Sequence, residues 1–295
     1  MRLRLGDRAL ELPAGAPALM GIVNATPDSF SDAQGSKPLD ALVGRALELA
    51  AAGAAIVDVG GESGRTDRPA VSVDEEASRV IPLVERLTAE GLAVSVDTWR
   101  APVARAALAA GAVLINDVSA LSDPAVATEC AATGAALVIA HTRVSPKIKA
   151  FPDHGDVVAD VLALLRERAT AARAAGVEEE RLLLDPGLDL GKTPAESVEL
   201  LRRLPELEQL GRPLLLAISR KDFVGALTGR PPRERDAGTL AAIEPALACS
   251  AGTVLRVHDV AGVADFLAVR AALRGDAETP AAPLDDALRR ESAPA

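Results

Sequence analysis

Polar residues follow short apolar runs throughout this chain, and the types of four of them suit a bound heterocycle. Asp97, Asn116, Asp185 and Lys221 each stand at or just after the end of such a run. A carboxylate can accept two parallel N–H bonds from an aminopyrimidine-like edge, and a lysine can donate to a ring nitrogen or a carbonyl oxygen. The four residues therefore predict a site for a neutral heterocycle that is rich in donors and acceptors.

A second group of polar residues suits an anion. Asn24, Arg65 and His258 also follow apolar runs, and Arg256 lies near the end of the last run. Arginine binds phosphate oxygens in fork geometry, and an asparagine carbonyl suits a hydrated Mg²⁺ ion that bridges a diphosphate. A heterocycle beside a diphosphate predicts a reaction that displaces pyrophosphate.

Each of these residues has a structural explanation when it is taken alone. Asp97 or Asp185 could cap a helix, Asn116 could hold a turn, and Lys221 could be a solvated helix residue. Polar groups follow nearly every apolar run, however, and the structural explanation would need the same coincidence each time. We therefore favour the functional interpretation.

The apolar runs are continuously hydrophobic and not alternating, which is typical of parallel strands buried on both faces. Those predicted as strands are Leu19–Val23, Ala55–Val59, Ala93–Val96, Val113–Ile115, Ala136–Ala140, Leu182–Leu184, Leu214–Ile218 and Val254–Val257. The segments predicted as helices are Leu39–Ala52, Val73–Ala89, Ala101–Ala110, Pro124–Thr133, Val157–Ala175, Ala195–Leu204, Asp236–Ala251 and Val260–Leu273.

This alternation of strands and helices predicts an α/β fold, a (β/α)₈ TIM barrel, in one domain over residues 1–274. A doubly wound open sheet is the alternative, but it more often stops at about five to seven strands. The carboxyl ends of barrel strands meet at one mouth, which is where the polar residues fall. We expect Met1 to Pro13 to form a short β-hairpin and residues 275–295 to form a disordered, flexible tail.

The composition excludes several classes of partner. A net charge of −10 and only 2% aromatic residues argue against nucleic acid and against an anionic membrane surface. No apolar run approaches the roughly 20 residues that span a bilayer. Cys130 and Cys249 lie far apart without metal-ligand spacing, so we expect two buried free thiols and a reducing, cytoplasmic location.

The motifs taken together resemble those of dihydropteroate synthases. The segment from Met20 to Asp32, which reads Met-Gly-Ile-Val-Asn-Ala-Thr-Pro-Asp-Ser-Phe-Ser-Asp, resembles the family's first-loop signature. The later motifs follow in the family's order: Asp58–Ser63, Ser95–Thr98, Ile115–Asp117, Asp185–Gly187, Ser219–Lys221 and Arg256–Asp259. The resemblance extends over roughly residues 17–273, and its first and last motifs are the most specific.

The resemblance implies a transferase of folate biosynthesis. Such enzymes join 7,8-dihydropterin-6-ylmethyl diphosphate to p-aminobenzoate with Mg²⁺ and release diphosphate. The family's pterin contacts would fall on Asp97, Asn116, Asp185 and Lys221. Its diphosphate contacts would fall on Asn24, Arg65, Arg256 and His258, with Asn24 as the metal ligand, and these residues with Lys221 would carry catalysis.

The resemblance also implies two larger features. The loops at Asp28–Ser36 and Ser63–Pro69 would close over the second substrate and exclude water. A homodimer would form through helices near the end of the barrel. The apolar segment Thr239–Ala251 is a candidate for that surface, although packing within the chain explains it equally well.

The acceptor side, which we expect to include Phe30, Gly64, Thr66, Ser219 and Asp222, departs from the family. The family usually reads Glu-Ser-Thr-Arg-Pro where this chain has Gly64 and Thr66, and many members carry a small hydroxyl residue in place of Asp222. Two carboxylates 4 Å apart repel by about 1 to 4 kcal/mol, depending on the local dielectric. Asp222 would therefore disfavour a benzoate, unless it turns away, meets a cation, or acts only as a first-turn helix acid.

The segment Thr142–Pro152 departs as well, because it lacks the family's usual Gly-Pro run. Its cations, Arg143, Lys147 and Lys149, belong either to a solvated loop or to an extra anion contact.

Three functional hypotheses follow. The protein is a dihydropteroate synthase with an unusual acceptor pocket, or a transferase of the same chemistry that uses another amine, or a pterin-binding protein with little catalytic activity. A corrinoid-protein methyltransferase is disfavoured by the first-loop motif and by the pair Arg256 and His258. A Schiff-base aldolase is disfavoured because Lys221 stands at a helix start and not inside an apolar strand.

Overall fold

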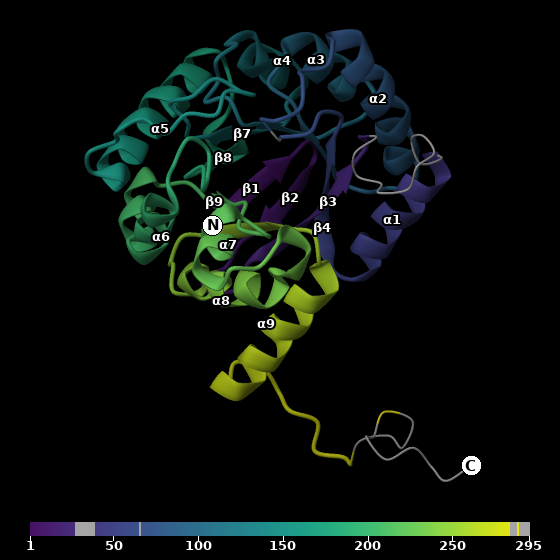
Figure 1. Cartoon of the computed structure of the whole chain (residues 1–295). Coiled ribbons are helices and arrows are strands. Elements are labelled where there is room, and N and C mark those ends of the chain that lie inside the picture. The colour runs from purple at the N-terminus through teal and green to yellow at the C-terminus, as the bar shows by residue number, and fades with distance from the viewer. Residues whose placement is uncertain (27–38, 65, 284–287, 289–295) are drawn as a thin grey trace.

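Eight parallel strands close into a barrel in the computed structural model, which describes residues 1–26, 39–64, 66–283 and 288. Neighbouring strands follow the order β10-β3-β4-β5-β6-β7-β8-β9, so the chain winds once around the barrel (Figure 1). The strands are β3 (Ala18–Asn24), β4 (Ala54–Gly60), β5 (Val94–Asp97), β6 (Leu114–Asp117), β7 (Ala136–Ala140), β8 (Leu182–Asp185), β9 (Leu214–Leu216) and β10 (Thr253–Val257). The predicted fold class is confirmed.

Helices surround the barrel and cover its outer face (Figure 1). They are α1 (Leu39–Ala51), α2 (Val73–Ala89), α3 (Ala101–Ala109), α4 (Ala125–Thr133), α5 (Val157–Ala174), α6 (Pro194–Arg202), α7 (Asp222–Thr228), α8 (Asp236–Leu247) and α9 (Val260–Arg274). Short 3₁₀ turns add η2 (Glu179–Arg181), η3 (Leu204–Leu210) and η4 (Pro232–Glu234). No helix range was predicted for α7 or η3, because neither is long enough to show a clear helical period, although Lys221 was expected at a helix start.

Local signals explain where several helices begin. The Ser72 side chain accepts from the Glu75 amide at the start of α2, and Thr193 and Glu196 form a reciprocal capping box at the start of α6. The predicted hairpin is also present, as β1 (Arg2–Leu5) and β2 (Arg8–Glu11).

The hairpin closes the amino end of the barrel. Leu3 and Leu12 are fully buried against Met20 and Ile56, which lie in the barrel strands. Arg181, just before β8, donates to the Gly6 carbonyl of the hairpin turn at 3.0 Å. The opposite end, where the strands reach their carboxyl termini, is left for the loops that carry the polar motifs.

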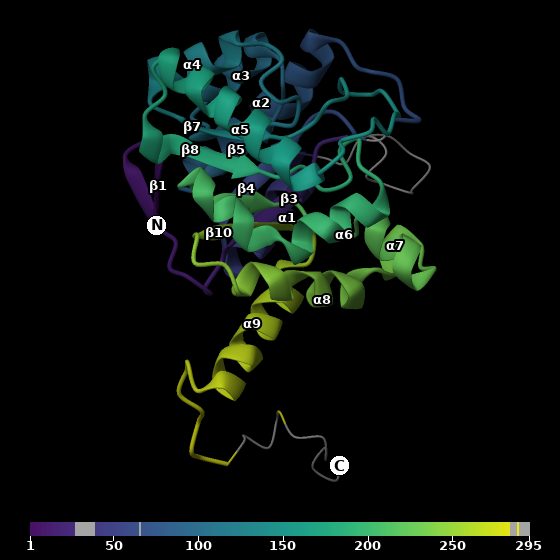
Figure 2. The same cartoon turned by 90° about the vertical axis from the view of Figure 1, so that its left-hand side faces the viewer.

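Beyond α9, residues 275–283 are exposed and form neither helix nor strand. Figure 2 shows α9 leading away from the barrel. Most of the predicted tail after residue 283 lies outside the described residues. Cys130 and Cys249 are buried free thiols, as predicted. In the part of the chain that the structure describes, no helix is long and apolar enough to cross a membrane.

Candidate active site

One row of residues crosses four neighbouring strands at the mouth of the barrel. Asn24 on β3 pairs in register with Gly60 on β4, Gly60 with Asp97 on β5, and Asp97 with Asn116 on β6. A Cβ atom at Gly60 would lie 3.6 Å from Asn24 Oδ1 and 3.8 Å from Asp97 Cβ. The absence of a side chain at Gly60 therefore leaves open space between the predicted metal ligand and a predicted pterin contact.

A buried carboxylate lies beneath this row. Asp58, fully buried on β4, accepts hydrogen bonds from three other strands. The donors are Arg256 Nε on β10 at 2.6 Å, Ser95 Oγ on β5 at 2.5 Å and Asn116 Nδ2 on β6 at 3.2 Å. Asp58 therefore fixes the positions of two predicted site residues.

Arg256 links Asp58 to the row above it. Its second hydrogen bond runs from Nη2 to Asp97 Oδ2 at 2.9 Å. Burial raises the pKa of Asp97 to about 7, and Asp58 adds to that rise, although Arg256 opposes it. The carboxylate form of Asp97 is thus held at a free-energy cost, which a ligand that donates N–H groups would offset.

Asn116 and Asp185 present acceptors in the same region. Asn116 is buried, and among the described residues its Oδ1 has no hydrogen-bond partner. Asp185 at the end of β8 is buried too, and its Oδ1 accepts from the Gly187 amide at 2.6 Å. Burial raises the pKa of Asp185, while the Gly187 amide and Lys221 act in the other direction. A buried polar atom without a partner costs free energy, so the unpaired amide oxygen indicates a ligand donor.

Lys221 stands at the start of α7, as predicted, and points back to the loop after β8. Its Nζ donates to the Leu188 carbonyl at 2.9 Å. The first turns of α8 hold this segment in place: Arg220 forms a two-pronged ion pair with Asp236, and Arg235 donates to the Lys221 carbonyl at 3.1 Å. Arg220 has a φ of +60°, a conformation that non-glycine residues adopt only when their surroundings enforce it.

His258, directly after β10, contacts Ser219 in the segment after β9. The imidazole Nδ1 is 2.9 Å from Ser219 Oγ, which also accepts from the His258 amide at 3.3 Å. Burial lowers the pKa of His258 to about 4, with Arg220 and Arg256 adding to the effect. The ring is therefore neutral near pH 7. If Nδ1 accepts from the serine hydroxyl, Nε2 carries the proton and can donate to an anion.

The acceptor-side residues are only partly brought together. Gly64 and Thr66 are exposed on the β4–α2 loop, and a Cβ atom at Gly64 would meet no described residue within 4 Å. Asp222 is 84% exposed and pairs with Arg235 at 2.9 Å. Asp222 thus meets a cation and lies in the first turn of α7, which are two of the three conditions under which it would tolerate a benzoate. Phe30, Arg65 and the loop Asp28–Ser36 lie outside the described residues.

This chain is similar to known proteins over most of its length. A family model described as pterin binding enzyme matches residues 20–258. The chain is 40% identical over 259 residues to dihydropteroate synthase from Synechocystis, with 86% of this chain and 89% of that protein covered. It is 42% identical over 249 residues to dihydropteroate synthase from Bacillus subtilis, with 83% and 85% covered.

Solved structures agree with these relatives. Dihydropteroate synthase from Xanthomonas albilineans with 4-aminobenzoic acid is similar at a TM-score of 0.85 and 45% identity, with 96% of this chain and 99% of that chain covered. The same enzyme in complex with 7,8-dihydropteroate is similar at a TM-score of 0.83 and 44% identity, with 96% and 100% covered. The chain belongs to the dihydropteroate synthase family.

Sequence reasoning missed one residue that organises the site of this family member. Asp58 was noted only as part of a signature, although an acid inside the apolar strand segment Ile56–Val59 is itself a signal, since a buried strand rarely carries an unpaired charge. Its role is to hold Arg256, Ser95 and Asn116 in place.

A second missed group lies behind Asp185. Lys192 is almost fully buried, and its Nζ lies 2.9 Å from both His141 Nδ1 and the Gly187 carbonyl. The other ring nitrogen of His141 lies 3.0 Å from Asp160. Burial lowers the pKa of Lys192 to about 7 and that of His141 to about 3, with Lys192 adding to the second effect. Lys192 thus links His141 to the turn after Asp185, and no sequence signal marks Lys192 as buried.

Replacing Asp58 tests how much the buried ion pair of Asp58 and Arg256 stabilises the fold. We expect Asp58→Ala to lower the free energy of unfolding by about 3 to 5 kcal/mol, because Arg256 would keep a buried charge with one partner removed. Asp40→Ala is the matched control: it breaks an exposed pair with Arg86 and should cost less than about 1 kcal/mol. Urea denaturation measures both values, and equal losses in the two variants would contradict the role of Asp58.

Proposed function

We propose that this protein is a transferase that condenses 7,8-dihydropterin-6-ylmethyl diphosphate with p-aminobenzoate and releases diphosphate, in the cytoplasm, as a step of folate biosynthesis. The observation that carries the proposal is the unpaired Asn116 Oδ1, buried in register beside Asp97. Together they form an acceptor edge at the mouth of a barrel whose relatives are dihydropteroate synthases.

The pterin would bind by its polar edge. Asp97, Asn116 Oδ1 and Asp185 would accept from its ring and amino N–H groups, and Lys221 would donate to a ring nitrogen or carbonyl oxygen. The carboxylates sit at fixed positions before the ligand arrives, so little reorganisation is needed on binding.

The diphosphate would lie toward Asn24, Arg65, Arg256 and His258. Arg256 has more N–H groups than its bonds to Asp58 and Asp97 use, and neutral His258 would donate through Nε2. Among the described residues no cluster of three or more His, Cys, Asp or Glu side chains could hold a metal. Asn24 would hold a Mg²⁺ ion together with water and the diphosphate, because Mg²⁺ commonly keeps several waters and needs few protein ligands. The ion would supply positive charge to the leaving diphosphate.

The reaction would then be an ionisation followed by capture. The bond between the pterin methylene carbon and the diphosphate oxygen breaks, and its electron pair leaves with the diphosphate. The amine nitrogen donates its lone pair to the methylene carbon to form the new C–N bond, and the amine loses a proton. The protein's part is electrostatic and positional: cations face the leaving group, while fixed acceptors hold the pterin ring.

A second candidate is the same chemistry with another amine. Gly64 favours it, since the described residues leave open space where the family's usual threonine would stand. The exposed, paired carboxylate of Asp222 gives it no support.

The test of the proposed function is pyrophosphate release from the pterin diphosphate with Mg²⁺, with and without p-aminobenzoate. We expect release to depend on p-aminobenzoate and to fall by at least about a hundredfold in Asp185→Ala, which loses a buried pterin acceptor worth about 3 kcal/mol. Release that depends on another arylamine instead would support the second candidate. Pterin binding without release in the presence of any amine would contradict both.

The pH dependence of pterin binding gives a separate test. Because the pKa of Asp97 is about 7, protons compete with the pterin for this carboxylate below that pH. We expect the dissociation constant for 6-hydroxymethylpterin to rise by up to about tenfold per pH unit below 7. Titration calorimetry from pH 5.5 to 8 measures it. In Asp97→Asn the affinity should be weak and this slope should vanish; an unchanged slope would assign the titration to another group.

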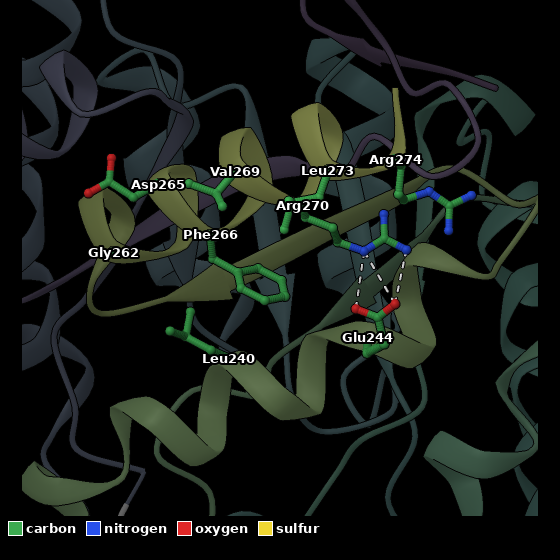
Figure 3. A pocket seen from close by; sticks show the side chains of 9 residues that line it. All are labelled: Leu240, Glu244, Gly262, Asp265, Phe266, Val269, Arg270, Leu273 and Arg274. Atoms are coloured by element: carbon green, nitrogen blue, oxygen red, sulfur yellow. Dashed lines mark hydrogen bonds and ion pairs between the residues drawn. The ribbon is translucent and has the colours of Figure 1, made fainter. Parts of the chain in front are cut away.

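We also propose that the protein is a homodimer through α8 and α9. A groove of about 670 Å³ lies between these helices, and Figure 3 shows Phe266 on α9 pointing toward Leu240 on α8. Val269 and Leu273 on α9 are 61% and 83% exposed. A contiguous apolar face of this kind is typical of an association surface, and a self-complementary one gives a twofold dimer.

Charge on this face should prevent association. We expect the double variant Val269→Glu and Leu273→Glu to elute with the mass of a monomer, while Leu227→Glu, which changes an exposed leucine on α7, keeps the mass of the dimer. Size-exclusion chromatography with light scattering measures the mass. A monomeric native protein, or a double variant that stays dimeric, would contradict the assignment.

A further inference from the structure

A lysine of the β7–α5 loop reaches the β4–α2 loop, 84 residues away in sequence. Lys147 Nζ donates to the Ser63 carbonyl at 2.7 Å and lies 3.9 Å from the Glu62 carboxylate. Its side chain is only 11% exposed. Lys147 therefore does not belong to a solvated loop, which was one of the two interpretations open from the sequence.

The loop that carries Lys147 has a firm base. Arg143 pairs with Asp160 of α5 at 2.6 Å, and Thr142 Oγ1 accepts from the Val144 amide at 3.1 Å. Val144 packs so closely on Gly191 that a Cβ atom there would lie 2.6 Å from its side chain. Lys147 itself has a φ of +70°. A lysine adopts this left-handed conformation only when its surroundings enforce it.

The target of Lys147 is a set of buried charges at the root of the β4–α2 loop. Glu62 is 2% exposed, pairs with Arg100 at 2.7 Å and accepts from the Val71 amide at 3.2 Å. Arg100 also pairs with Glu76 and donates to the Val71 carbonyl at 3.2 Å. Arg100 thus pairs with two buried acids, Glu62 and Glu76. Lys147 adds a second positive charge near Glu62, which offsets the cost of burying two carboxylates beside one arginine.

The order of the strands shows which part of the barrel mouth the contact between Lys147 and Ser63 crosses. β5 and β6, which carry Asp97 and Asn116, lie between β4 and β7. A contact between the loops after β4 and β7 therefore spans the pterin side of the mouth. It ends on Ser63, next to Gly64 on the acceptor side.

We propose that Lys147 is a positioning residue that clamps the β4–α2 loop in the arrangement that receives the acceptor amine. Lys147 touches neither substrate; it acts through Ser63 and Glu62. The kinetic part of this inference rests on the proposed function, whereas the clamp itself does not. Losing the clamp should weaken acceptor binding and leave the pterin contacts on Asp97, Asn116 and Asp185 in place.

The test compares Lys147→Met with Lys149→Met, a matched control that removes an exposed lysine two residues away. We expect the KM for p-aminobenzoate to rise about tenfold in Lys147→Met, with kcat and the dissociation constant of the pterin diphosphate within about twofold of native values. Lys147→Arg, which keeps the cation, should recover much of the loss. Lys147→Gly, which relieves the positive φ but lacks the cation, should behave like Lys147→Met.

Hydrogen exchange at the Val71 amide tests the clamp without any turnover. This amide should exchange about tenfold faster in Lys147→Met than in the native protein or in Lys149→Met, because its acceptor Glu62 loses a cation. If the native protein releases no pyrophosphate, the proposed function fails while the exchange result still decides on the clamp. Native exchange in Lys147→Met, a native KM, or equal weakening of pterin and acceptor would overturn the proposal.

Discussion

The buried pair of Asp58 and Arg256 is the interaction on which the mouth of this barrel depends. A carboxylate and a guanidinium removed from water are costly unless each finds several partners. Asp58 meets this requirement with donors from β5, β6 and β10, and Arg256 by a second bond to Asp97. Satisfying these charges fixes the ends of four strands, β4, β5, β6 and β10, relative to one another, and this arrangement sets the positions of Asn116 and Asp97.

The same arrangement raises the free energy of the site when no ligand is bound. Burial raises the pKa of both Asp97 and Asp185, so each carboxylate form is destabilised at the mouth, and Asn116 Oδ1 is unpaired among the described residues. A ligand that donates N–H groups to these atoms recovers the missing hydrogen bonds. Binding energy in this account comes from acceptors that the fold holds in unfavourable surroundings.

The sequence predicted most of the fold, because continuous apolar strands and Ala-rich helices alternate without ambiguity and the polar residues follow the strands. It also predicted that Asp97 and Asn116 lie at one mouth, since the carboxyl ends of barrel strands meet there. It missed what depends on tertiary contacts. Lys192 is buried between His141, which is distant in sequence, and the nearby Gly187 carbonyl. The direction of Asp222 is set by Arg235, and the reach of Lys147 to Ser63 follows from loop packing. None of these leaves a periodic signal along the chain.

The most direct test of the account is a crystal structure of the protein with 7,8-dihydropteroate bound. The account predicts that the pterin edge lies within about 3 Å of Asn116 Oδ1, Asp97 and Asp185, with the Asp58–Arg256 pair unchanged. A pterin bound elsewhere, or an Asn116 Oδ1 that stays unpaired beside the bound ligand, would contradict it.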